Sequence, residues 1–132
     1  MALLSVIIPT HNRAQRVLRA VRSVCDQSFQ DMEIIVVDDG SEDQTVPLLR
    51  NIDVRVKIIC HPQRRGVSAA RNTGIRRSEG SLIAFLDSDD RWLPRKADLQ
   101  VAFFFQNPEA DACQTEEIWI RRGKRVNPRR KH

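Results

Sequence analysis

Three carboxylates stand close together after one apolar run of this chain, and their spacing suits metal chemistry. Asp87, Asp89 and Asp90 follow directly on residues 82–86, which are five apolar residues in a row. Such a run is typical of a strand buried on both faces, whose carboxyl end lies at the ligand-binding edge of a parallel sheet. Asp87 and Asp89, two positions apart, can each turn an oxygen towards one hard cation. We therefore predict a Mg²⁺ or Mn²⁺ site here, with a solvated acidic loop as the alternative.

Two other loops of the predicted sheet edge carry polar side chains that suit a nucleotide. Thr10 and Asn12 follow a β-branched run, and Asp38 and Asp39 follow a second apolar run. Each pattern has a simpler explanation, because Thr10 or Asn12 can cap a helix and Asp-Asp-Gly is typical of a turn. Together they favour ligand binding, since Asp oxygens accept hydrogen bonds from ribose hydroxyls or a base N–H. A cation on Asp89 would stabilise a diphosphate leaving group, which predicts transfer from a nucleotide-activated donor.

The elements that must position these loops alternate between strand and helix with a spacing of roughly 25 residues, typical of βαβ units in a parallel sheet. We therefore predict an α/β fold, with a mostly parallel sheet flanked by helices. The expected strands cover residues 5–10, 33–37, 54–60 and 82–86, with Pro9 ending the first. The expected helices cover residues 17–25, 43–50, 67–77 and a segment with Pro94 in its first turn. Residues 112–120 are expected to form a further strand, with a hairpin turn at residues 121–124.

Composition and charge exclude several classes of protein. With 132 residues, of which 41% are hydrophobic, the chain suits one domain with a substantial core. The net charge of +5 comes from residues 121–132, which hold seven Lys or Arg and no acid. The rest of the chain carries 15 basic against 17 acidic side chains, and there is no tyrosine to stack on bases. We therefore expect no nucleic-acid partner.

The cysteines and the apolar runs indicate in which cellular compartment the protein is expected. Cys25, Cys60 and Cys113 are far apart, which argues against a disulfide framework or structural zinc, and we expect Cys25 and Cys60 to be small buried hydrophobes. No apolar run is long enough to span a membrane, and residues 1–5 lack the features of a signal peptide. We expect a cytoplasmic protein, and a peripheral position at the inner membrane face stays open.

Four segments carry a more specific pattern. Residues 6–13, 36–41, 66–74 and 85–90 resemble, in order and spacing, the motifs of the inverting family 2 glycosyltransferases. The resemblance implies a Rossmann-like GT-A fold that binds nucleotide-diphospho-sugars. It also implies a metal-dependent transfer of sugar from a nucleoside diphosphate sugar, with a UDP-sugar favoured, in the synthesis of cell envelope polysaccharide.

Carried over by position, the resemblance implies roles for individual residues. Asp39 would hold the base, and Arg71 would help to fix the base and the acid loop. Asp87 would lie near the ribose and would join Asp89 in ligating the metal. Trp92 has two explanations, packing or ligand contact. The implied nucleotide-sugar-binding residues are Pro9, Thr10, Asn12, Asp38, Asp39, Arg71 and Asp87.

The general base that inverting transfer requires has no assigned residue. The family places this Asp or Glu well beyond the metal-binding acids, so we expect it beyond His132 and expect this chain to be an N-terminal, donor-binding part. Glu116 and Glu117 are acceptor-side candidates, although a strand-edge position is slightly favoured. The expected division is a donor-binding core at 1–110 and the start of an acceptor-side region, with a β-hairpin and basic tail, at 111–132. The acceptor, a glycan, lipid or protein, stays open, as does self-association through an unpaired sheet edge.

Two other functions are compatible with the residues alone. A nucleotidyltransferase also combines such a sheet with acid-held metal, but it favours a Gly-rich loop after the first strand, and residues 10–13 contain no glycine. A non-catalytic nucleotide-binding or polyanion-binding module could use the basic tail, and we rank it last.

Overall fold

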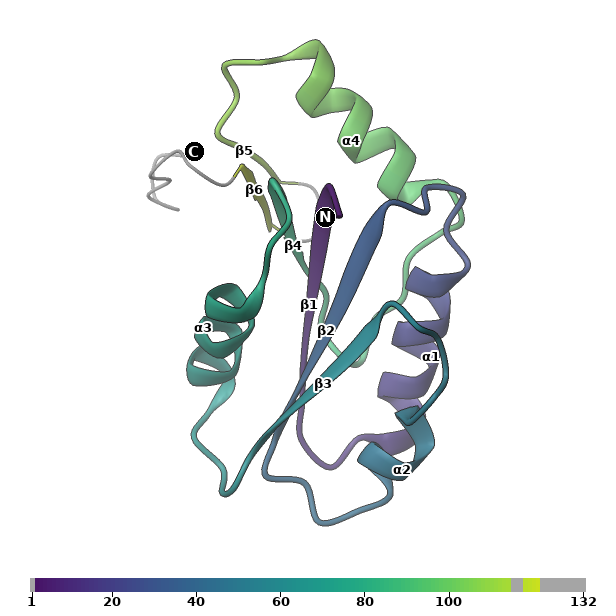
Figure 1. Cartoon of the computed structure of the whole chain (residues 1–132), viewed down its shortest axis with the longest axis vertical. Coiled ribbons are helices and arrows are strands. Elements are labelled where there is room, and N and C mark those ends of the chain that lie inside the picture. The colour runs from purple at the N-terminus through teal and green to yellow at the C-terminus, as the bar shows by residue number, and fades with distance from the viewer. Residues whose placement is uncertain (1, 115–117, 122–132) are drawn as a thin grey trace.

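The structure is a computed structural model that describes residues 2–114 and 118–121. These residues form one six-stranded sheet with helices on both faces (Figure 1), in the strand order β3-β2-β1-β4-β6-β5. The elements in chain order are β1 (Leu4–Thr10), α1 (Ala14–Cys25), β2 (Met32–Asp39), α2 (Thr45–Leu49), β3 (Val56–His61), α3 (Val67–Arg77), β4 (Leu82–Phe85), α4 (Lys96–Gln106), β5 (Ala112–Gln114) and β6 (Ile118–Arg121).

The sheet is parallel over its first four strands. β1 pairs with β2 on one side and with β4 on the other, and β3 pairs with β2, all in parallel. β6 runs antiparallel to both β4 and β5. The chain therefore moves outward from β1 through β2 and β3, and then crosses back to place β4 on the opposite side of β1. The prediction of a mostly parallel α/β sheet is confirmed, and its topological switch point lies between β1 and β4.

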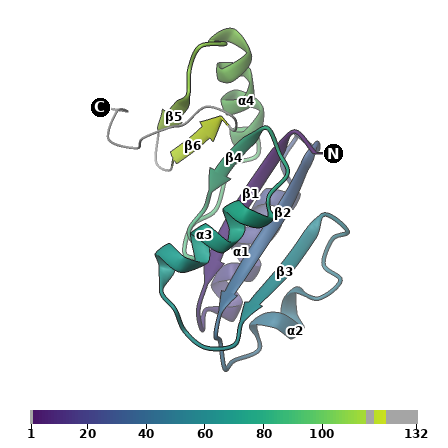
Figure 2. The same ribbon diagram turned by 60° about the vertical axis from the view of Figure 1, so that its left-hand side comes forward.

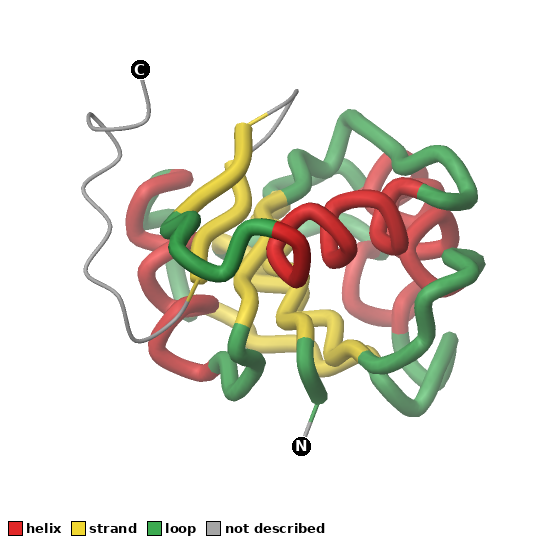
Figure 3. Tube along the Cα trace, turned by 90° about the horizontal axis from the view of Figure 1, so that it is seen from above, coloured by secondary structure: helices red, strands yellow, loops and turns green. Residues whose placement is uncertain are grey.

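Helices cover both faces of the central strands, which explains why β1 and β2 are buried along their whole length. One core joins the even-numbered residues of β1 to buried side chains of α1 and α4. On the other face, Ile35 and Val37 of β2 pack with Ala70 of α3. Figure 2 shows α3 in front of the sheet and α1 behind it, and Figure 3 shows the strands between these helices from above.

Helix α3 contacts β1 through a glycine, Gly74, where the strand leaves no room for a side chain. A Cβ atom built on Gly74 would lie 2.4 Å from Ile7 Cγ2, far inside normal contact distance. Ile7 is fully buried, so the strand offers no room for the added atom. The small residue therefore sets the distance between helix and sheet, and with it the position of the first turn of α3.

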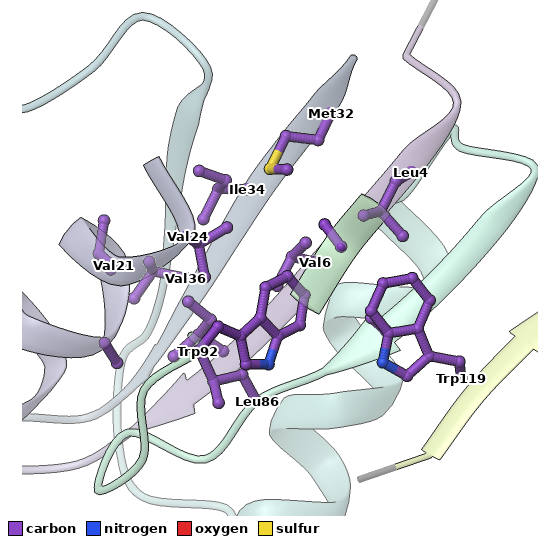
Figure 4. Close-up of a cluster of buried hydrophobic side chains, with 14 of the residues drawn as sticks. Leu4, Val6, Val21, Val24, Met32, Ile34, Val36, Leu86, Trp92 and Trp119 are labelled. Atoms are coloured by element: carbon purple, nitrogen blue, oxygen red, sulfur yellow. The ribbon is translucent and has the colours of Figure 1, made fainter. Parts of the chain in front are cut away.

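Two tryptophans join the segment after β4 to the antiparallel edge of the sheet. The rings of Trp92 and Trp119 stack with centroids 5.4 Å apart and planes at 23° (Figure 4). Both are buried, and they belong to the same core as Leu86. Of the two explanations for Trp92, the structure supports packing.

The sequence predicted that Pro9 would end the first strand. This prediction is wrong, because Pro9 lies inside β1. The carbonyl of Ile7 accepts a hydrogen bond from Leu86 N at 3.0 Å, so Ile7 faces β4 in the ladder. Pro9 lies two residues later on the same side, and the β1–β4 pairing ends at Ile7 and Phe85. Proline fits there because its missing N–H falls beyond the paired residues.

The prediction of one strand over residues 112–120 is wrong. β5 and β6 are antiparallel, with Cys113 opposite Trp119, so the chain reverses between them. Of the expected hairpin turn at 121–124, residues 122–124 lie outside the described residues. Arg121 belongs to β6 because it pairs with Leu82 of β4. The candidate acceptor-side residues Glu116 and Glu117, and the whole tail after Arg121, lie outside the described residues.

Three smaller expectations also receive an answer. Pro94 precedes α4, which begins at Lys96, because the carbonyl of Pro94 accepts a hydrogen bond from Ser28 N at 3.1 Å and is held in a turn. Cys60 is exposed rather than buried, since β3 is the outer strand of the sheet. Cys25 is partly buried, and burial raises the pKa of its thiol to about 11.

Among the described residues, no helix has the length and apolarity needed to cross a bilayer.

Candidate donor-binding site

A cleft of about 530 Å³ opens at the carboxyl edge of the sheet, between the loops that follow β1, β2 and β4 and the first turn of α3. Three separate βα units thus meet there, as the sequence predicts for a parallel sheet. Among the predicted site residues that the structure describes, Asp38 and Arg71 do not line the cleft. Those that line it are Pro9, Thr10, Asn12, Asp39, Asp87 and Asp89.

The loops after β1 and β2 are held together by hydrogen bonds that centre on Asn12. Its backbone N–H donates to Ser41 Oγ at 2.8 Å, and its Oδ1 accepts from Glu42 N at 2.8 Å. The neighbouring His11 places Nδ1 2.7 Å from the carbonyl oxygen of Asp39. Asn12 has φ +50°, a conformation that asparagine tolerates better than most residues. Asn12 therefore shapes one wall of the cleft by joining two loops.

Asp39 forms the buried floor of the cleft, with only 3% of its surface exposed. Its Oδ1 accepts from Arg65 N at 2.9 Å and lies 2.8 Å from His61 Nδ1, while its Oδ2 accepts from Gly66 N at 2.8 Å. Burial alone would raise the pKa of Asp39, but these hydrogen bonds outweigh it and lower the pKa below its ordinary value. Asp39 is thus an anion that fixes the loop between β3 and α3.

The acid loop after β4 is held by arginines from two other elements. Arg71 of α3 donates through Nη2 to Asp87 Oδ1 at 3.1 Å. Asp89 Oδ1 lies 3.3 Å from Arg16 Nη1 and 3.5 Å from Arg13 Nη1, at the start of α1. The side chains of Asp87 and Asp89 are 60% and 49% exposed, so both carboxylates remain accessible from the cleft.

These two carboxylates fit a hard divalent cation. Mg²⁺ in proteins is commonly held by one or two carboxylates together with water and the phosphates of a substrate. No group of three or more His, Cys, Asp or Glu suited to a metal occurs among residues 2–114 and 118–121. The donor set therefore suits an ion that arrives with a diphosphate better than one held by protein ligands alone.

Three buried polar atoms near the cleft have no hydrogen-bond partner within the described part of the chain. They are Thr10 Oγ1, Asp38 Oδ1 and Arg71 Nε. Thr10 and Asp38 are opposite one another in the β1–β2 ladder. Because buried polar groups are normally paired, such atoms are places where a ligand or water can supply the missing partner.

Sequence reasoning did not assign the part of the cleft that comes from the β3–α3 connection. Arg64, Val67 and Ala70 line it, and half of the Val67 surface is exposed there. β3 is parallel to β2, so its carboxyl end reaches the same sheet edge as the other loops. That topological argument could have identified Arg64, three residues after β3, as a cleft residue.

The family is decided by comparison with known proteins. The model of glycosyl transferase family 2 matches residues 5–131. The chain belongs to glycosyl transferase family 2. Membership favours sugar transfer over the nucleotidyltransferase and polyanion-binding alternatives.

Curated relatives of this family 2 chain include bacterial glycosyltransferases. It is 35% identical over 106 residues to the Escherichia coli UDP-Glc:alpha-D-GlcNAc-diphosphoundecaprenol beta-1,3-glucosyltransferase WfgD, covering 80% of this chain and 42% of the relative. It is 38% identical to the putative teichuronic acid biosynthesis glycosyltransferase TuaG of Bacillus subtilis, covering 79% and 42% respectively. The chain thus spans less than half the length of these relatives.

Solved structures confirm the GT-A fold of this family 2 chain. The S. aureus TarS 1-349 complex with UDP matches with a TM-score of 0.78 and 28% identity, over 85% of this chain and 34% of that one. The mannosyltransferase PcManGT from Pyrobaculum calidifontis, in complex with GDP-Man and Mn²⁺, matches with a TM-score of 0.80 over 91% of this chain and 44% of that one. Its identity is 22%, so this second likeness shows the fold alone.

Proposed function

We propose that this chain binds a nucleoside diphosphate sugar, with a UDP-sugar favoured, as the donor-binding part of an inverting glycosyltransferase. The observation that carries the proposal is one cleft that contains Asp87 and Asp89 together with Thr10 and Asp39. The names of the relatives support it, since WfgD uses UDP-Glc and TarS was solved with UDP.

Each part of the cleft has a proposed role in donor binding. The buried carboxylate of Asp39 faces the base, with Pro9 and Val67 as apolar surface beside it. Asp87, fixed by Arg71, accepts hydrogen bonds from the ribose hydroxyls. The unpaired Thr10 hydroxyl and the Arg71 Nε–H supply further polar partners.

A divalent ion fits beside Asp89, with Asp87 as the second protein ligand. Such an ion, when bound, neutralises the diphosphate so that it can leave from the anomeric carbon. Asp89 would hold this ion, and in the structure its carboxylate lies within 3.5 Å of Arg13 and Arg16 at the start of α1. The two guanidinium groups add positive charge where the diphosphate is proposed to lie.

The acceptor side is proposed from the relatives. WfgD acts on a diphosphoundecaprenol-linked sugar, and TuaG is assigned to teichuronic acid synthesis. We propose a glycan or lipid-linked acceptor of the cell envelope, reached from the cytoplasmic membrane face. We further propose residues 1–110 as the donor-binding core and 111–132 as the start of the acceptor-side region, which contains the acceptor-side candidates Glu116 and Glu117.

The test is a thermal-shift series on the 132-residue chain with UDP, UDP-glucose and GDP, each with and without Mn²⁺. We expect UDP to raise the melting temperature only when Mn²⁺ is present. Asp89→Asn should abolish this rise, whereas Asp90→Asn, at the next exposed acid and outside the cleft lining, should retain it. The absence of a shift with every nucleotide, or an equal loss in both variants, would contradict the proposal.

A further inference from the structure

A buried chain of hydrogen bonds runs from the surface of α3 to the floor of the cleft. Arg76 Nη2 lies 3.2 Å from Thr73 Oγ1, and Thr73 Oγ1 lies 2.8 Å from His61 Nε2. His61 Nδ1 in turn lies 2.8 Å from Asp39 Oδ1. His61 is 6% exposed and Thr73 is 8% exposed, so water has little access to this chain.

The direction of the hydrogen bonds at the two ends of this chain follows from the chemistry of Arg76 and Asp39. The guanidinium of Arg76 can only donate, so Thr73 Oγ1 accepts from it. At the other end Asp39 is an anion and can only accept, so His61 Nδ1 carries the proton. His61 therefore presents an Nδ1–H to Asp39, while its Nε2 lies against the Thr73 hydroxyl.

The Asp39 end of the chain controls one wall of the cleft. The same carboxylate accepts from the backbone N–H groups of Arg65 and Gly66, which fixes the loop before α3. Gly66, with φ +102°, directs the chain from this loop into α3. The first turns of α3 carry Val67 into the cleft and Arg71 onto the acid loop.

We propose that His61 is a positioning residue for nucleotide binding, because it holds the Asp39 carboxylate in the orientation that presents the β3–α3 wall to the donor. This inference rests on the proposed function. It differs from a role in folding alone, since α3 is already packed on the sheet through Gly74 against Ile7 and through Ala70 against Ile35 and Val37.

The experiment compares two amide variants of the 132-residue chain. His61→Asn places an N–H donor at the position of Nδ1 and keeps the bond to Asp39. His61→Gln reaches the position of Nε2 near Thr73 and leaves Asp39 without this donor. Unfolding in urea gives the folded fraction of each variant, and calorimetric titration with UDP and Mn²⁺ gives affinity per folded molecule. Hydrogen exchange of the Arg65 and Gly66 amides gives a readout that needs no ligand.

We expect His61→Asn to bind UDP within about threefold of wild type and His61→Gln to bind at least about tenfold more weakly, the size of one lost hydrogen bond to a charged group. The Arg65 and Gly66 amides should exchange faster in His61→Gln alone. Equal affinity and equal amide protection in the two variants would overturn the proposal. A long-range ¹H–¹⁵N spectrum should show a proton on Nδ1 of His61, and an Nδ1 without a proton would also overturn the proposal.

Failure of this inference is separable from failure of the proposed function. If wild type does not bind UDP with Mn²⁺, the proposed function fails, and the amide exchange of Arg65 and Gly66 still decides whether His61 positions the wall. If wild type binds and His61→Gln binds equally well, the proposed function stands and the role of His61 is refuted.

Discussion

Replacing Asp39 with Asn tests whether this buried carboxylate holds the cleft together, and the chain provides a matched control beside it. Asp38 and Asp39 are 4% and 3% exposed, so burial is the same for both. They differ in their partners, since Asp39 has three hydrogen-bond donors, whereas Asp38 Oδ1 has none among the described residues. A comparison of Asp39→Asn with Asp38→Asn therefore isolates the hydrogen bonds from the cost of burial.

The magnitude follows from counting the donors at Asp39. An Asn side chain has one oxygen, which can keep the bonds to His61 and Arg65 at the Oδ1 position. Its NH₂ group then faces Gly66 N–H, and leaving that part-buried donor unpaired costs about 1–3 kcal/mol. The two remaining bonds lose their charge assistance, which costs about 1 kcal/mol each. Burial of a neutral amide is less costly than burial of a carboxylate, so we expect a net loss of about 3 kcal/mol.

Urea unfolding at pH 7 measures this loss directly. The free energy of unfolding of Asp38→Asn should be within about 1 kcal/mol of the wild-type value or higher, because this change removes a buried charge from an oxygen without a partner among the described residues. The assay also has a pH arm. The hydrogen bonds lower the folded-state pKa of Asp39 against the opposing effect of burial, so its stabilisation is complete above the ordinary Asp pKa of about 3.9. It is lost as the pH falls through the folded pKa, and the difference between wild type and Asp39→Asn should shrink there. A loss equal to that of Asp38→Asn, or one that does not change with pH, would refute the reasoning.

The remaining predictions address packing, the acid loop and the opposite end of the sheet. Gly74→Ala should destabilise the fold by about 2 kcal/mol in urea unfolding, because overpacking against Ile7 costs up to about 3 kcal/mol and the better helix former returns about 1. In an Ile7→Ala background the same change should cost nothing, and an unchanged penalty there would contradict the contact. Arg71→Ala removes a solvent-exposed ion pair with Asp87, so unfolding should change by less than about 1 kcal/mol while titration shows weaker binding of UDP with Mn²⁺. Equal UDP affinity would count against this role of Arg71. Glu33→Gln should cost about 2 kcal/mol at pH 7, because a hydroxyl, a backbone amide and an ammonium bond to that buried carboxylate and lower its pKa despite burial. The difference from wild type should fall as the pH drops below about 4.3, and a constant difference would contradict it.

The sequence was sufficient for the sheet and for the edge that carries the cleft. Apolar runs ended by polar residues predicted four parallel strands, and the loops at their carboxyl ends converge because topology requires it. Thr10, Asp39, Asp87 and Asp89 were therefore brought to one cleft from three distant segments, as expected.

What the sequence could not show is which polar side chains use their hydrogen bonds internally. Asn12 and Asp39 are residue types that commonly contact ligands. In the structure, however, the side chain of each accepts a hydrogen bond from a backbone N–H of another loop. Such bonds depend on distances between loops that the local pattern does not contain. The antiparallel β5–β6 pair was missed for a related reason, since only the pairing of residues 112–114 with residues 118–120 reveals the reversal.

The cleft combines a fixed wall at Asp39 with an adjustable wall at Asp89. The two walls differ because the carboxylate of Asp39 is buried, whereas that of Asp89 is half exposed to water. Asp39 is buried and accepts from three donors, of which His61 is buried and the Arg65 and Gly66 amides are part-buried, so movement of its carboxylate leaves these groups unpaired at up to about 1–3 kcal/mol each. Asp89 is half exposed, and its pairs with Arg13 and Arg16 are each worth no more than about 1 kcal/mol. A metal ion can therefore draw Asp89 away from the arginines at small cost, whereas no ligand can turn Asp39 so cheaply. It follows that substitutions at Asp39 should appear first in stability, while those at Asp89 should appear in metal-dependent binding with the fold unchanged.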